Sequence, residues 1–376
     1  MPITIAIPKE INSDESRVAI TPDLVSKLIK LGAVVKIQHD AGTGIHARDD
    51  LYKNTEISPD TNSLYTNSNV ILKVQPPTDE EVGQMQENSI LISFLYPHLN
   101  PKTIKKLLEK KITSFAMELI PRISRAQNMD ALSSQATVSG YKAILLAAAN
   151  SQFFFPMLTT AAGSIRPAKV FVIGAGVAGL QAIATAKRLG AQVSAYDVRP
   201  DTKEQTESLG AKFVDTGVQA TGAGGYAREL TPEEKTKQAE SLKKHLAICD
   251  VVITTAGVPG KPAPKIITKD MVAAMKPGAI IVDVLADMGG NCELTKPGET
   301  IKYNDITIIG PINIPSQLAI HASEMYARNL INLLCLMIKD NALNLDWTDE
   351  IISGSVVTHG GFIKNVAVQK LLGDKL

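Results

Sequence analysis

The stretch from Lys169 to Arg199 constrains the fold more than any other part of this sequence. It opens with Lys169–Ile173, a β-branched run that is typical of a buried parallel strand. A segment with helical apolar periodicity follows and ends at Gly190, where glycine is typical of a helix end. A second strand is predicted over Gln192–Tyr196. The turn between the first strand and the helix has the pattern G-x-G-x-x-G, formed by Gly174, Gly176 and Gly179.

The spacing of these three glycines indicates a site for a dinucleotide. In a strand–turn–helix unit, the first glycine permits the tight turn, the second lets the backbone approach a pyrophosphate, and the third lets the helix pack closely on the strand. The N-terminus of the helix offers N–H groups and about half a positive charge to a phosphate. The pattern therefore predicts that this turn holds the pyrophosphate of a bound dinucleotide.

An acidic residue after the second strand predicts which dinucleotide is bound. Asp197 lies 18 residues after Gly179, where a carboxylate can bind both hydroxyls of an adenosine ribose. A 2′-phosphate about 4 Å from this carboxylate would be repelled by roughly 4 kcal/mol. We therefore expect NAD(H) to bind and NADP(H) to be rejected. Arg199 lies nearby, and its charge alone predicts a solvated surface residue.

The composition excludes several other classes of protein. The chain has 376 residues, which predicts two domains. Its 39 basic and 38 acidic residues give a net charge of +1, which argues against a nucleic-acid-binding surface. The six histidines show no metal-ligand spacing, so no metal site is predicted. The apolar run Leu330–Ile338 is about half the length that spans a bilayer, so we expect a soluble chain. Three cysteines that are far apart in the sequence are expected to be reduced, buried thiols, namely Cys249, Cys292 and Cys335.

Strands and helices alternate along both halves of the chain, which predicts parallel α/β sheets. Helices are predicted in the first half over Pro22–Leu31 and Pro101–Lys111, followed by a long and largely apolar helix over Ala131–Asn150. Further strands are predicted over Ile3–Ile7, Val34–Gln38, Val70–Val74, Ile90–Leu95 and Thr113–Met117 in the first half, and over Lys212–Val214, Val251–Thr255, Ala279–Val284 and Ile306–Ile309 in the second.

This alternation predicts two doubly wound, Rossmann-like α/β domains whose parallel sheets face each other across a cleft. The first domain comprises residues 1–135 and 325–376, because a second long helix over Ser316–Lys339 is expected to return the chain to it. The second domain comprises residues 136–324 and carries the glycine pattern. The two long helices are expected to join the domains.

A polar and basic segment, Met117–Gln135, lies between a predicted strand and the first long helix. Its guanidinium and amide groups are donors that can hold the carboxamide and phosphates of a dinucleotide. Spacing alone favours a simpler interpretation, in which Asp130 caps the helix that begins at Ala131 and the arginines are solvated. The residues concerned are Arg122, Arg125, Gln127, Asp130 and Ser133.

A second candidate segment is the glycine-rich loop Ala220–Leu230, which carries one aromatic residue, Tyr226. Its glycines are typical of a mobile lid over a bound cofactor. A passive surface loop fits the same residues equally well. Thr254–Gly257 ends a predicted strand at the carboxyl edge of the same sheet, so its backbone can line an adenosine pocket.

Five further residues can be combined into a site for a small substrate. A lysine and an arginine together would hold a carboxylate, and a histidine or an aspartate could move a proton. Each of these residues, taken singly, is expected to be an ordinary surface or interface group. They are Arg17, Lys73, Tyr96, His98 and Asp287.

Taken together, these features resemble the soluble NAD(H)-binding subunit of the proton-translocating nicotinamide nucleotide transhydrogenases, and more distantly the alanine dehydrogenases, which share the two-domain plan. The resemblance covers essentially the whole chain. The shared motifs are PKE and ESRVAITP near the start, LKVQPP, the glycine pattern with YDVR, and PGKPAP before MVAAMKPGAIIVDV. The motifs that resemble the transhydrogenases alone are MELIPRISRAQNMDALSSQA, GAGGYARE, GGNCELT and the ending NLNLDWTDEIISGSVVTHGG.

The resemblance implies that both candidate segments contact the nucleotide. Arg122 and Gln127 would orient the nicotinamide ring, Asp130 with Ser133 would support the loop, and Tyr226 would be the tip of a closing loop. The further residues implied to bind the cofactor are Arg125, Val172, Gly174, Gly176, Val177, Gly179, Asp197, Val198, Arg199, Gly225, Gln238 and Gly257.

The resemblance also implies a reaction and its partners. A hydride would pass directly between NADH on this chain and NADP⁺ on a partner subunit, while protons cross the membrane through membrane-spanning subunits. The chain would be a homodimer docked on the cytoplasmic face of that assembly. One alternative is an NAD-dependent alanine dehydrogenase, in which Tyr96 stands at the place of the proton-carrying histidine. The other alternative is a non-catalytic NAD(H)-binding module.

Overall fold

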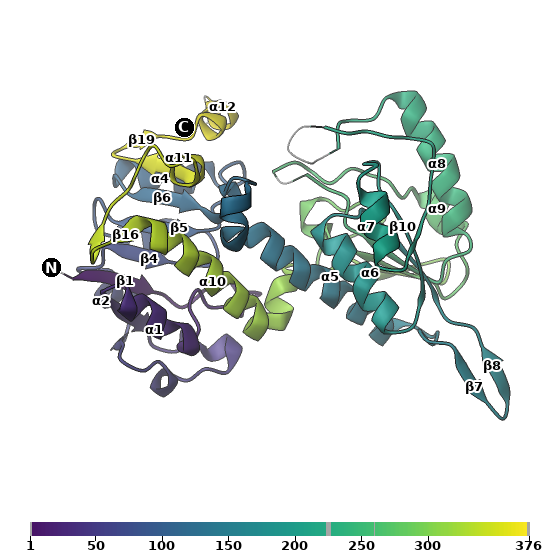
Figure 1. The fold of residues 1–376 in the computed structure, drawn as a ribbon, viewed down its shortest axis with the longest axis horizontal. Coiled ribbons are helices and arrows are strands. Elements are labelled where there is room, and N and C mark those ends of the chain that lie inside the picture. Colours follow the sequence, from purple (N-terminus) through teal and green to yellow (C-terminus); the bar gives the residue numbers. More distant parts are fainter. Residues whose placement is uncertain (1, 223–226, 259, 374–376) are drawn as a thin grey trace. The chain divides into compact units, whose positions relative to one another are not determined.

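The computed structural model describes residues 2–222, 227–258 and 260–373 (Figure 1). The chain forms two compact units, unit 1 (Met1–Gln135 with Ser316–Leu376) and unit 2 (Ala136–Pro315). It passes from unit 1 into unit 2 within helix α5 (Ala131–Asn150) and returns just before helix α10 (Ala319–Met337). Each unit has its own sheet and hydrophobic core, so the predicted α/β class with two domains is confirmed.

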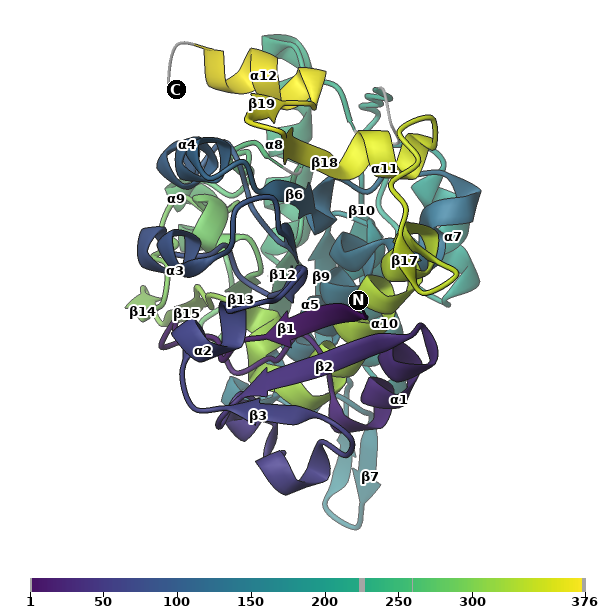
Figure 2. The same ribbon diagram turned by 90° about the vertical axis from the view of Figure 1, so that its left-hand side faces the viewer.

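The sheet of unit 1 is parallel over the strand order β3-β2-β1-β4-β5-β6. The chain leaves β1 towards one edge and resumes at β4 on the other side, which is the doubly wound arrangement. Two strands from the C-terminal segment, β18 and β19, extend the sheet beside β6, and β18 runs antiparallel to both neighbours (Figure 2). The strands are β1 (Ile3–Ile7), β2 (Ala33–Gln38), β3 (Glu56–Ser58), β4 (Val70–Leu72), β5 (Ile90–Ser93), β6 (Thr113–Ala116), β18 (Val356–His359) and β19 (Phe362–Ile363).

Both faces of this sheet are covered, because successive residues of its central strands point to opposite sides. In β1, Ile3, Ile5 and Ile7 pack with α10 and with α1 (Pro22–Lys30) on one face. Ala6 packs with three short helices and the C-terminal helix on the other face. The remaining helices of unit 1 are α2 (Thr61–Tyr65), α3 (Asp79–Gln84), α4 (Pro101–Glu109), α11 (Glu350–Ser355) and α12 (Val366–Leu372).

The sheet of unit 2 has the order β11-β10-β9-β12-β13-β15-β14. It is parallel except for the edge strand β14, which runs antiparallel to β15. The chain again changes sides at its first strand, between β9 and β12. The strands are β9 (Lys169–Ile173), β10 (Gln192–Tyr196), β11 (Lys212–Phe213), β12 (Val251–Thr254), β13 (Ile280–Asp283), β14 (Thr300–Tyr303) and β15 (Ile306–Ile309).

Alternating residues of β9 separate the core of unit 2 into two layers. Val170 and Val172 pack with α5 and α6, whereas Phe171 and Ile173 pack with α8 and α9. This alternation explains why the sequence of β9 is apolar throughout: both of its faces are covered by helices. The helices of unit 2 besides α5 are α6 (Val177–Arg188), α7 (Thr202–Ser208), α8 (Pro232–Leu246) and α9 (Lys269–Ala273).

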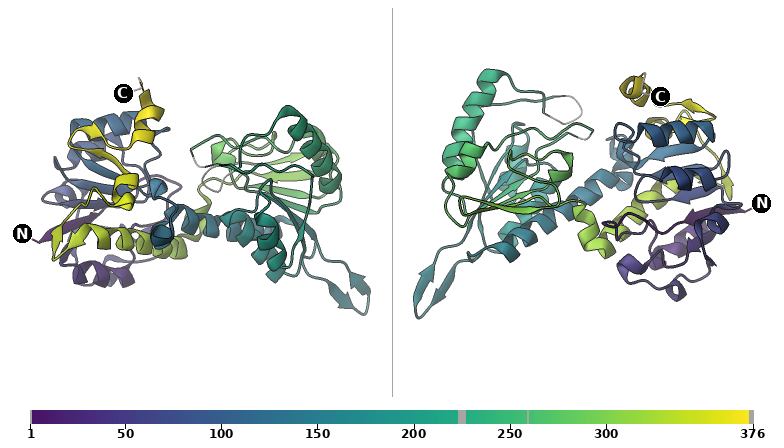
Figure 3. Two further views of the ribbon diagram at one scale, coloured as in Figure 1. Left: turned by 45° about the horizontal axis from the view of Figure 1, so that its top comes forward. Right: turned by 180° about the vertical axis from the view of Figure 1, so that it is seen from behind.

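A hairpin of β7 (Leu158–Thr160) and β8 (Gly163–Ile165) projects from the body of unit 2 (Figure 3). The sequence did not predict it, because neither strand is long enough to show alternation. A second small hairpin in unit 1, formed by β16 (Ile338–Lys339) and β17 (Ala342–Leu343), was not predicted either. The short 3₁₀ helices are η1 (Thr43–Ile45), η2 (Asp49–Leu51), η3 (Met117–Leu119), η4 (Ser124–Met129), η6 (Ala286–Met288) and η7 (Ile314–Leu318).

Two expectations about the fold are corrected by the structure. The sheets are not wholly parallel, since β14 and β18 are antiparallel to their neighbours. Cys249 and Cys292 are buried as expected, but Cys335 is exposed, because it lies on the outer side of α10. Within residues 2–222, 227–258 and 260–373, no helix combines the length and the apolar character that crossing a membrane requires.

Candidate functional site

The carboxyl ends of β9, β10 and β12 lie side by side in unit 2. Ile173 of β9 is opposite Tyr196 of β10 and Thr254 of β12, so the residues that follow these strands share one edge of the sheet. This edge is the point at which the chain changes sides, where open α/β sheets bind their ligands. The glycine turn, Asp197 and the backbone of residues 255–257 are therefore brought together here.

The three glycines of the turn have different steric surroundings. Gly174 has a φ of +94°, and an added Cβ would lie 2.9 Å from the backbone nitrogen of Ala256. An added Cβ at Gly179 would lie 1.8 Å from the carbonyl oxygen of Gly174, so α6 packs directly on the turn. At Gly176 the nearest atom to such a Cβ is Nη2 of Arg199, at 3.8 Å. Of the three, Gly176 alone leaves space for a ligand against its backbone.

The Asp197 carboxylate accepts four hydrogen bonds from the protein itself. One comes from the backbone N–H of Ala175 (2.8 Å), and the others come from the backbone N (2.9 Å), Nε (2.9 Å) and Nη2 (2.7 Å) of Arg199. The Asp197 side chain is 7% exposed and that of Arg199 is 23% exposed. The expectation that Arg199 is a solvated charge is wrong, because a bidentate ion pair holds its guanidinium on Asp197.

The other predicted contacts of unit 2 lie at different depths. Val177 is 41% exposed at the start of α6, whereas Val172 has no exposed surface and lies in the core. The side-chain amide of Gln238 in α8 donates to the hydroxyl of Tyr196 at 2.8 Å, so it supports the end of β10 from below. Gly257 is exposed after β12.

Two predicted contacts, Gly225 and Tyr226, lie outside the described residues. The described ends of their loop meet in an isolated bridge between Thr221 and Ala227. The half-buried Val198 is joined to the same segment, because its carbonyl oxygen accepts a hydrogen bond from the N–H of Ala220 at 2.8 Å. The loop therefore starts beside the end of β10.

Two buried polar residues that the sequence did not single out hold this edge of the sheet. Asn291 accepts a hydrogen bond from the N–H of Ala256 (3.1 Å) and donates to the carbonyl oxygens of Ala256 (2.7 Å) and Pro264 (2.9 Å). A side-chain amide can do this because it donates and accepts at once. Asp283, at the end of β13, accepts from the N–H of Cys292 at 2.9 Å. The available signal was the motif GGNCELT, which contains Asn291.

The polar segment Met117–Gln135 lies in unit 1, across η3, η4 and the first turn of α5. Asp130 caps α5 as predicted, because its carboxylate accepts from the N–H (2.9 Å) and the hydroxyl (2.6 Å) of Ser133. Arg125 is not simply solvated, since it forms a bidentate ion pair with Asp349 at 2.8 and 2.9 Å. The other two residues of the segment, Arg122 and Gln127, are exposed.

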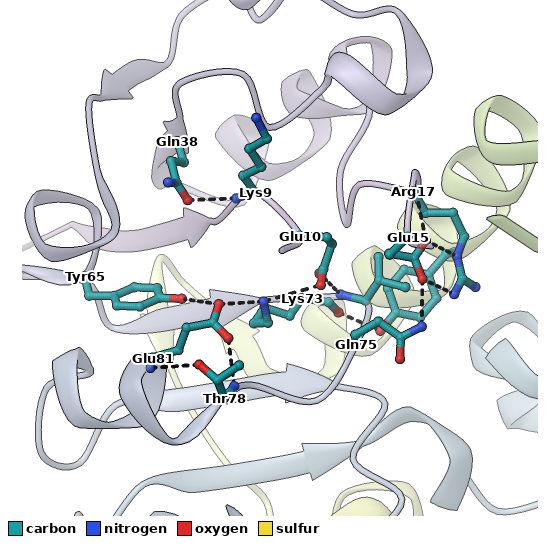
Figure 4. Close-up of polar contacts among 12 residues, drawn as sticks. Lys9, Glu10, Glu15, Arg17, Gln38, Tyr65, Lys73, Gln75, Thr78 and Glu81 are labelled. Atoms are coloured by element: carbon teal, nitrogen blue, oxygen red, sulfur yellow. Dashed lines mark hydrogen bonds and ion pairs between the residues drawn. The ribbon is translucent and has the colours of Figure 1, made fainter. Parts of the chain in front are cut away.

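Lys73 lies at the point where the chain changes sides in the sheet of unit 1, and it is buried. Its Nζ is 2.7 Å from Oε1 of Glu81 and 3.4 Å from Oε2 of Glu10 (Figure 4). The three side chains are 1–6% exposed. Glu10 also accepts from the N–H of Val74 (2.6 Å), and the hydroxyl of Tyr65 donates to Glu81 (3.5 Å). The expectation that Lys73 is a surface group is therefore wrong.

The electrostatics of this cluster leave the lysine charge balanced from within. Burial lowers the pKa of Lys73, but the attraction of Glu10 and Glu81 outweighs it, so the pKa lies above its ordinary value. Burial raises the pKa of Glu10 despite the nearby ammonium. One cation therefore faces two carboxylates of its own chain, and it is not available to hold the carboxylate of a substrate.

The other residues of the predicted substrate site are divided between the units. Arg17 is 4% exposed and binds Glu15 through Nε (2.8 Å) and Nη2 (2.6 Å), while Nη1 donates to Gln135 (2.9 Å). It is thus a buried residue and not a surface group. Arg17, Lys73, Tyr96 and His98 belong to unit 1, whereas Asp287 belongs to unit 2, in η6.

Glu118 holds a strained turn after β5. Tyr96 has a φ of +43°, a left-handed conformation that is uncommon for residues other than glycine. The backbone N–H groups of Tyr96 and Leu95 both donate to the Glu118 carboxylate. Burial raises the pKa of Glu118 to about 7.

We expect Glu118 to make unit 1 less stable as the pH rises from about 5 to 8. The folded state binds this proton more tightly than the unfolded state, so the stabilisation is complete below the unfolded pKa and is lost as the pH passes the folded pKa. A shift from 4.5 to about 7 corresponds to about 3 kcal/mol. The measurement is urea unfolding followed by the fluorescence of Trp347, the single tryptophan, which lies in unit 1.

Glu118→Gln should flatten this pH dependence, whereas Glu109→Gln, at an exposed position of α4, should leave it unchanged. A wild-type protein whose free energy of unfolding varies with pH no more than that of Glu118→Gln would contradict the prediction.

His39, Asp40 and Asp49 come together after β2, which their spacing did not predict. Nδ1 of His39 is 2.6 Å from Asp49, and Nε2 is 3.6 Å from Asp40. The histidine and Asp40 are exposed. The hydrogen bond to Asp49 raises the pKa of His39, and Asp40 adds to this effect. The group is a solvated polar turn.

Family models match both halves of the chain. The model described as "Alanine dehydrogenase/PNT, N-terminal domain" matches residues 6–139, and "Alanine dehydrogenase/PNT, C-terminal domain" matches residues 143–366. The chain belongs to the alanine dehydrogenase/PNT family. The resemblance inferred from the motifs is thereby confirmed.

Relatives within the alanine dehydrogenase/PNT family divide into two groups by their similarity to this chain. An NAD(P) transhydrogenase alpha subunit of Rhodospirillum rubrum is 45% identical, over 97% of this chain and 98% of its own length. The alanine dehydrogenase of Mycolicibacterium smegmatis is 29% identical, over 97% and 96%. Among solved structures, a transhydrogenase from Sinorhizobium meliloti has a TM-score of 0.87 at 41% identity, and covers 96% of this chain and 99% of that one.

Proposed function

We propose that this member of the family is the NAD(H)-binding component of a proton-translocating NAD(P) transhydrogenase. The observation that carries the proposal is the 45% identity, over almost the full length of both chains, to a transhydrogenase alpha subunit. The internally balanced charge of Lys73 also supports it, because a dehydrogenase of amino acids needs a cation for the substrate carboxylate. The chain would act only together with partner subunits, one of which binds NADP(H).

The residues of unit 2 fit NAD(H). Gly176 leaves open space against its backbone, while Gly174 and Gly179 are crowded by the turn and the helix. The N–H groups at the start of α6 would hold the pyrophosphate, and Asp197 would accept the ribose hydroxyls. In unit 1, we propose that Arg122 and Gln127 orient the nicotinamide ring and that Asp130, bonded to Ser133, keeps their segment in place.

The reaction we propose is direct hydride transfer between two nicotinamide rings. NADH supplies the hydride when it is bound. Such a step needs no general acid or base, so the task of this chain is to bind, to orient and to exclude water. Proximity and orientation of this kind can contribute roughly 7–11 kcal/mol to catalysis. A cluster of orienting donors, and not an acid–base pair, is what the residues provide.

The test is a reconstitution with separate arms. The purified chain is incubated with NADPH and an oxidised NAD analogue, with and without the NADP(H)-binding partner subunit. We expect turnover only with the partner. NADH formation from L-alanine and NAD⁺ by the chain alone would instead establish a dehydrogenase. NADH binding without turnover in any arm would establish a non-catalytic binding module.

Gln127→Asn should slow hydride transfer more than it weakens NADH binding. The shortened side chain keeps its amide but moves it away from the ring, and a misplacement of about 1 Å can cost about 100-fold in rate. The measurements are single-turnover rates in the reconstituted complex and the NADH dissociation constant. Gln369→Asn makes the same change at an exposed position of α12 and should alter neither. Equal effects on rate and binding would reduce Gln127 to a passive contact.

We also propose that the chain is a homodimer that docks, through its partner subunits, on the cytoplasmic face of a membrane. Support for the dimer comes from apolar side chains around the base of the β7–β8 hairpin. An isolated two-stranded hairpin is marginally stable in water, and exposed apolar patches are typical of protein contacts. The residues are Phe153 (36% exposed), Phe154 (54%), Met157 (66%) and Ile165 (48%).

Light scattering of the purified chain tests the proposed dimer. We expect the mass of a dimer, and of a monomer after Phe154→Glu with Met157→Glu. Phe362→Glu changes a phenylalanine that is 73% exposed in unit 1, and it should leave the dimer intact. A monomeric wild-type chain would contradict the proposal.

A further inference from the structure

We infer that Arg199 determines how strongly the nucleotide site discriminates between NAD(H) and NADP(H), by occupying the carboxylate that the ribose must use. The inference rests on the proposed NAD(H) site and adds to it a residue that sets specificity. Its basis is the arrangement of Arg199 on Asp197 and above Gly176.

The first observation is that the acceptor positions of the Asp197 carboxylate are all in use. A carboxylate has about four lone-pair sites. Oδ1 accepts from the backbone N and Nε of Arg199, and Oδ2 accepts from the N–H of Ala175 and from Nη2 of Arg199, at 2.7–2.9 Å. A ribose that donates two hydroxyl hydrogens to Asp197 therefore has to displace two existing donors.

The second observation identifies which donors leave. The two backbone N–H groups belong to the turn after β9 and to the end of β10, so they are held by the sheet. The guanidinium is at the end of a flexible side chain that is 23% exposed. It is the Nε and Nη2 bonds of Arg199 that yield to the ribose, while the backbone bonds keep the carboxylate oriented.

The third observation places the guanidinium over the phosphate-binding turn. Nη2 of Arg199 lies 3.8 Å from the position of a Cβ at Gly176, the one glycine of the turn whose backbone is open to a ligand. The side chain thus lies over the place where the nucleotide is expected to bind. Binding of NAD(H) exchanges this ion pair for hydrogen bonds to the ribose.

The charge of Arg199 has the opposite effect on NADP(H). The repulsion of a 2′-phosphate by Asp197 is reduced while a guanidinium lies 2.7 Å from the carboxylate. The guanidinium can also bind that phosphate directly. Arg199 therefore competes with the ribose of NAD(H) and tolerates the phosphate of NADP(H), so that both effects lower the selectivity of the site.

The test compares Arg199→Ala with the wild-type chain by equilibrium titration with NADH and with NADPH. We expect the ratio of the NADPH to the NADH dissociation constant to rise about 10-fold or more, since hydrogen bonds to charged groups are worth about 1.5–3 kcal/mol. The dissociation constant of NADH itself should stay equal or fall. Arg199→Gln, which keeps the length without the charge, should change the ratio in the same direction.

Arg48→Ala is the matched control, because Arg48 forms a similar pair with Asp50, two residues away, on the surface of unit 1 (3.1 Å). Its ratio should equal that of the wild type. An unchanged ratio in Arg199→Ala, or an equal weakening of both nucleotides, would overturn the inference while leaving the NAD(H) site in place. A wild-type chain that binds no NADH would overturn the proposed function as well.

Discussion

Replacing Lys73 by methionine is expected to destabilise unit 1 by about 3–5 kcal/mol, because it leaves two buried carboxylates without their cation. Lys73 is 1% exposed and lies 2.7 Å from Glu81 and 3.4 Å from Glu10, which are themselves 6% and 3% exposed. Methionine is close to lysine in length and fills the same space, so the loss reports on charge and not on packing. Urea unfolding followed by Trp347, which lies in unit 1, measures the effect.

Two further variants make this prediction specific. Lys111→Met removes an exposed lysine whose ion pair with Glu87 is just as short (2.6 Å), and should have no measurable effect because solvent screens that pair. Neutralising the partners as well, by adding Glu10→Gln and Glu81→Gln, should restore much of the lost stability. A Lys73→Met protein as stable as Lys111→Met would show that the cluster is not a buried charge network.

The second large effect is expected at the glycine turn, where two alanine substitutions should separate binding from folding. Gly176→Ala has space for its methyl group, and we expect an unchanged melting temperature. The methyl group projects where the pyrophosphate is expected, so NADH affinity should fall about 10- to 100-fold for each lost hydrogen bond to phosphate worth about 1.5–3 kcal/mol. Gly179→Ala should lose both properties, because its Cβ would lie 1.8 Å from the carbonyl oxygen of Gly174.

The cost of Gly179→Ala to folding should be about 3 kcal/mol or more, since the clash involves backbone and cannot be relieved by a side-chain rotation. Calorimetry and NADH titration of the same samples measure the two properties. Gly83→Ala in α3 is the control, because nothing lies within 4 Å of its added Cβ. A Gly176→Ala protein that binds NADH as tightly as the wild type would contradict the assignment of the pyrophosphate to this turn.

The regular elements were predictable where local pattern and tertiary environment agree. β9, β10, β15 and α5 have the bounds that the sequence predicted, because each is a continuous apolar or periodic run limited by glycine, proline or polar residues. The β7–β8 hairpin and the C-terminal strands were missed. Strands of two to four residues carry no periodicity, and β18 and β19 exist because β6 offers an edge that only the folded sheet creates.

The candidate site was predictable in its chemistry but not in its contacts. The positions of the three glycines and Asp197 follow from spacing, since a strand, a turn and a helix bring them to one edge. That Arg199 lies on Asp197 does not follow, because an arginine side chain can reach many positions from one backbone site. Asn291 was missed for a similar reason: it acts on Ala256, 35 positions earlier in the chain, and only the sheet brings the two together.

The sequence by itself determined the fold class, the nucleotide-binding turn and the family, because these depend on short-range spacing of glycine, apolar and acidic residues. The tertiary structure alone decided which charges are balanced from within. Lys73, Arg17 and Arg199 look alike in the sequence as cations near strand ends, yet each is held by carboxylates of its own chain. The physical reason is that burial makes an ion depend on its immediate neighbours, and neighbours such as Glu10 and Lys73 are assembled only when distant segments fold together.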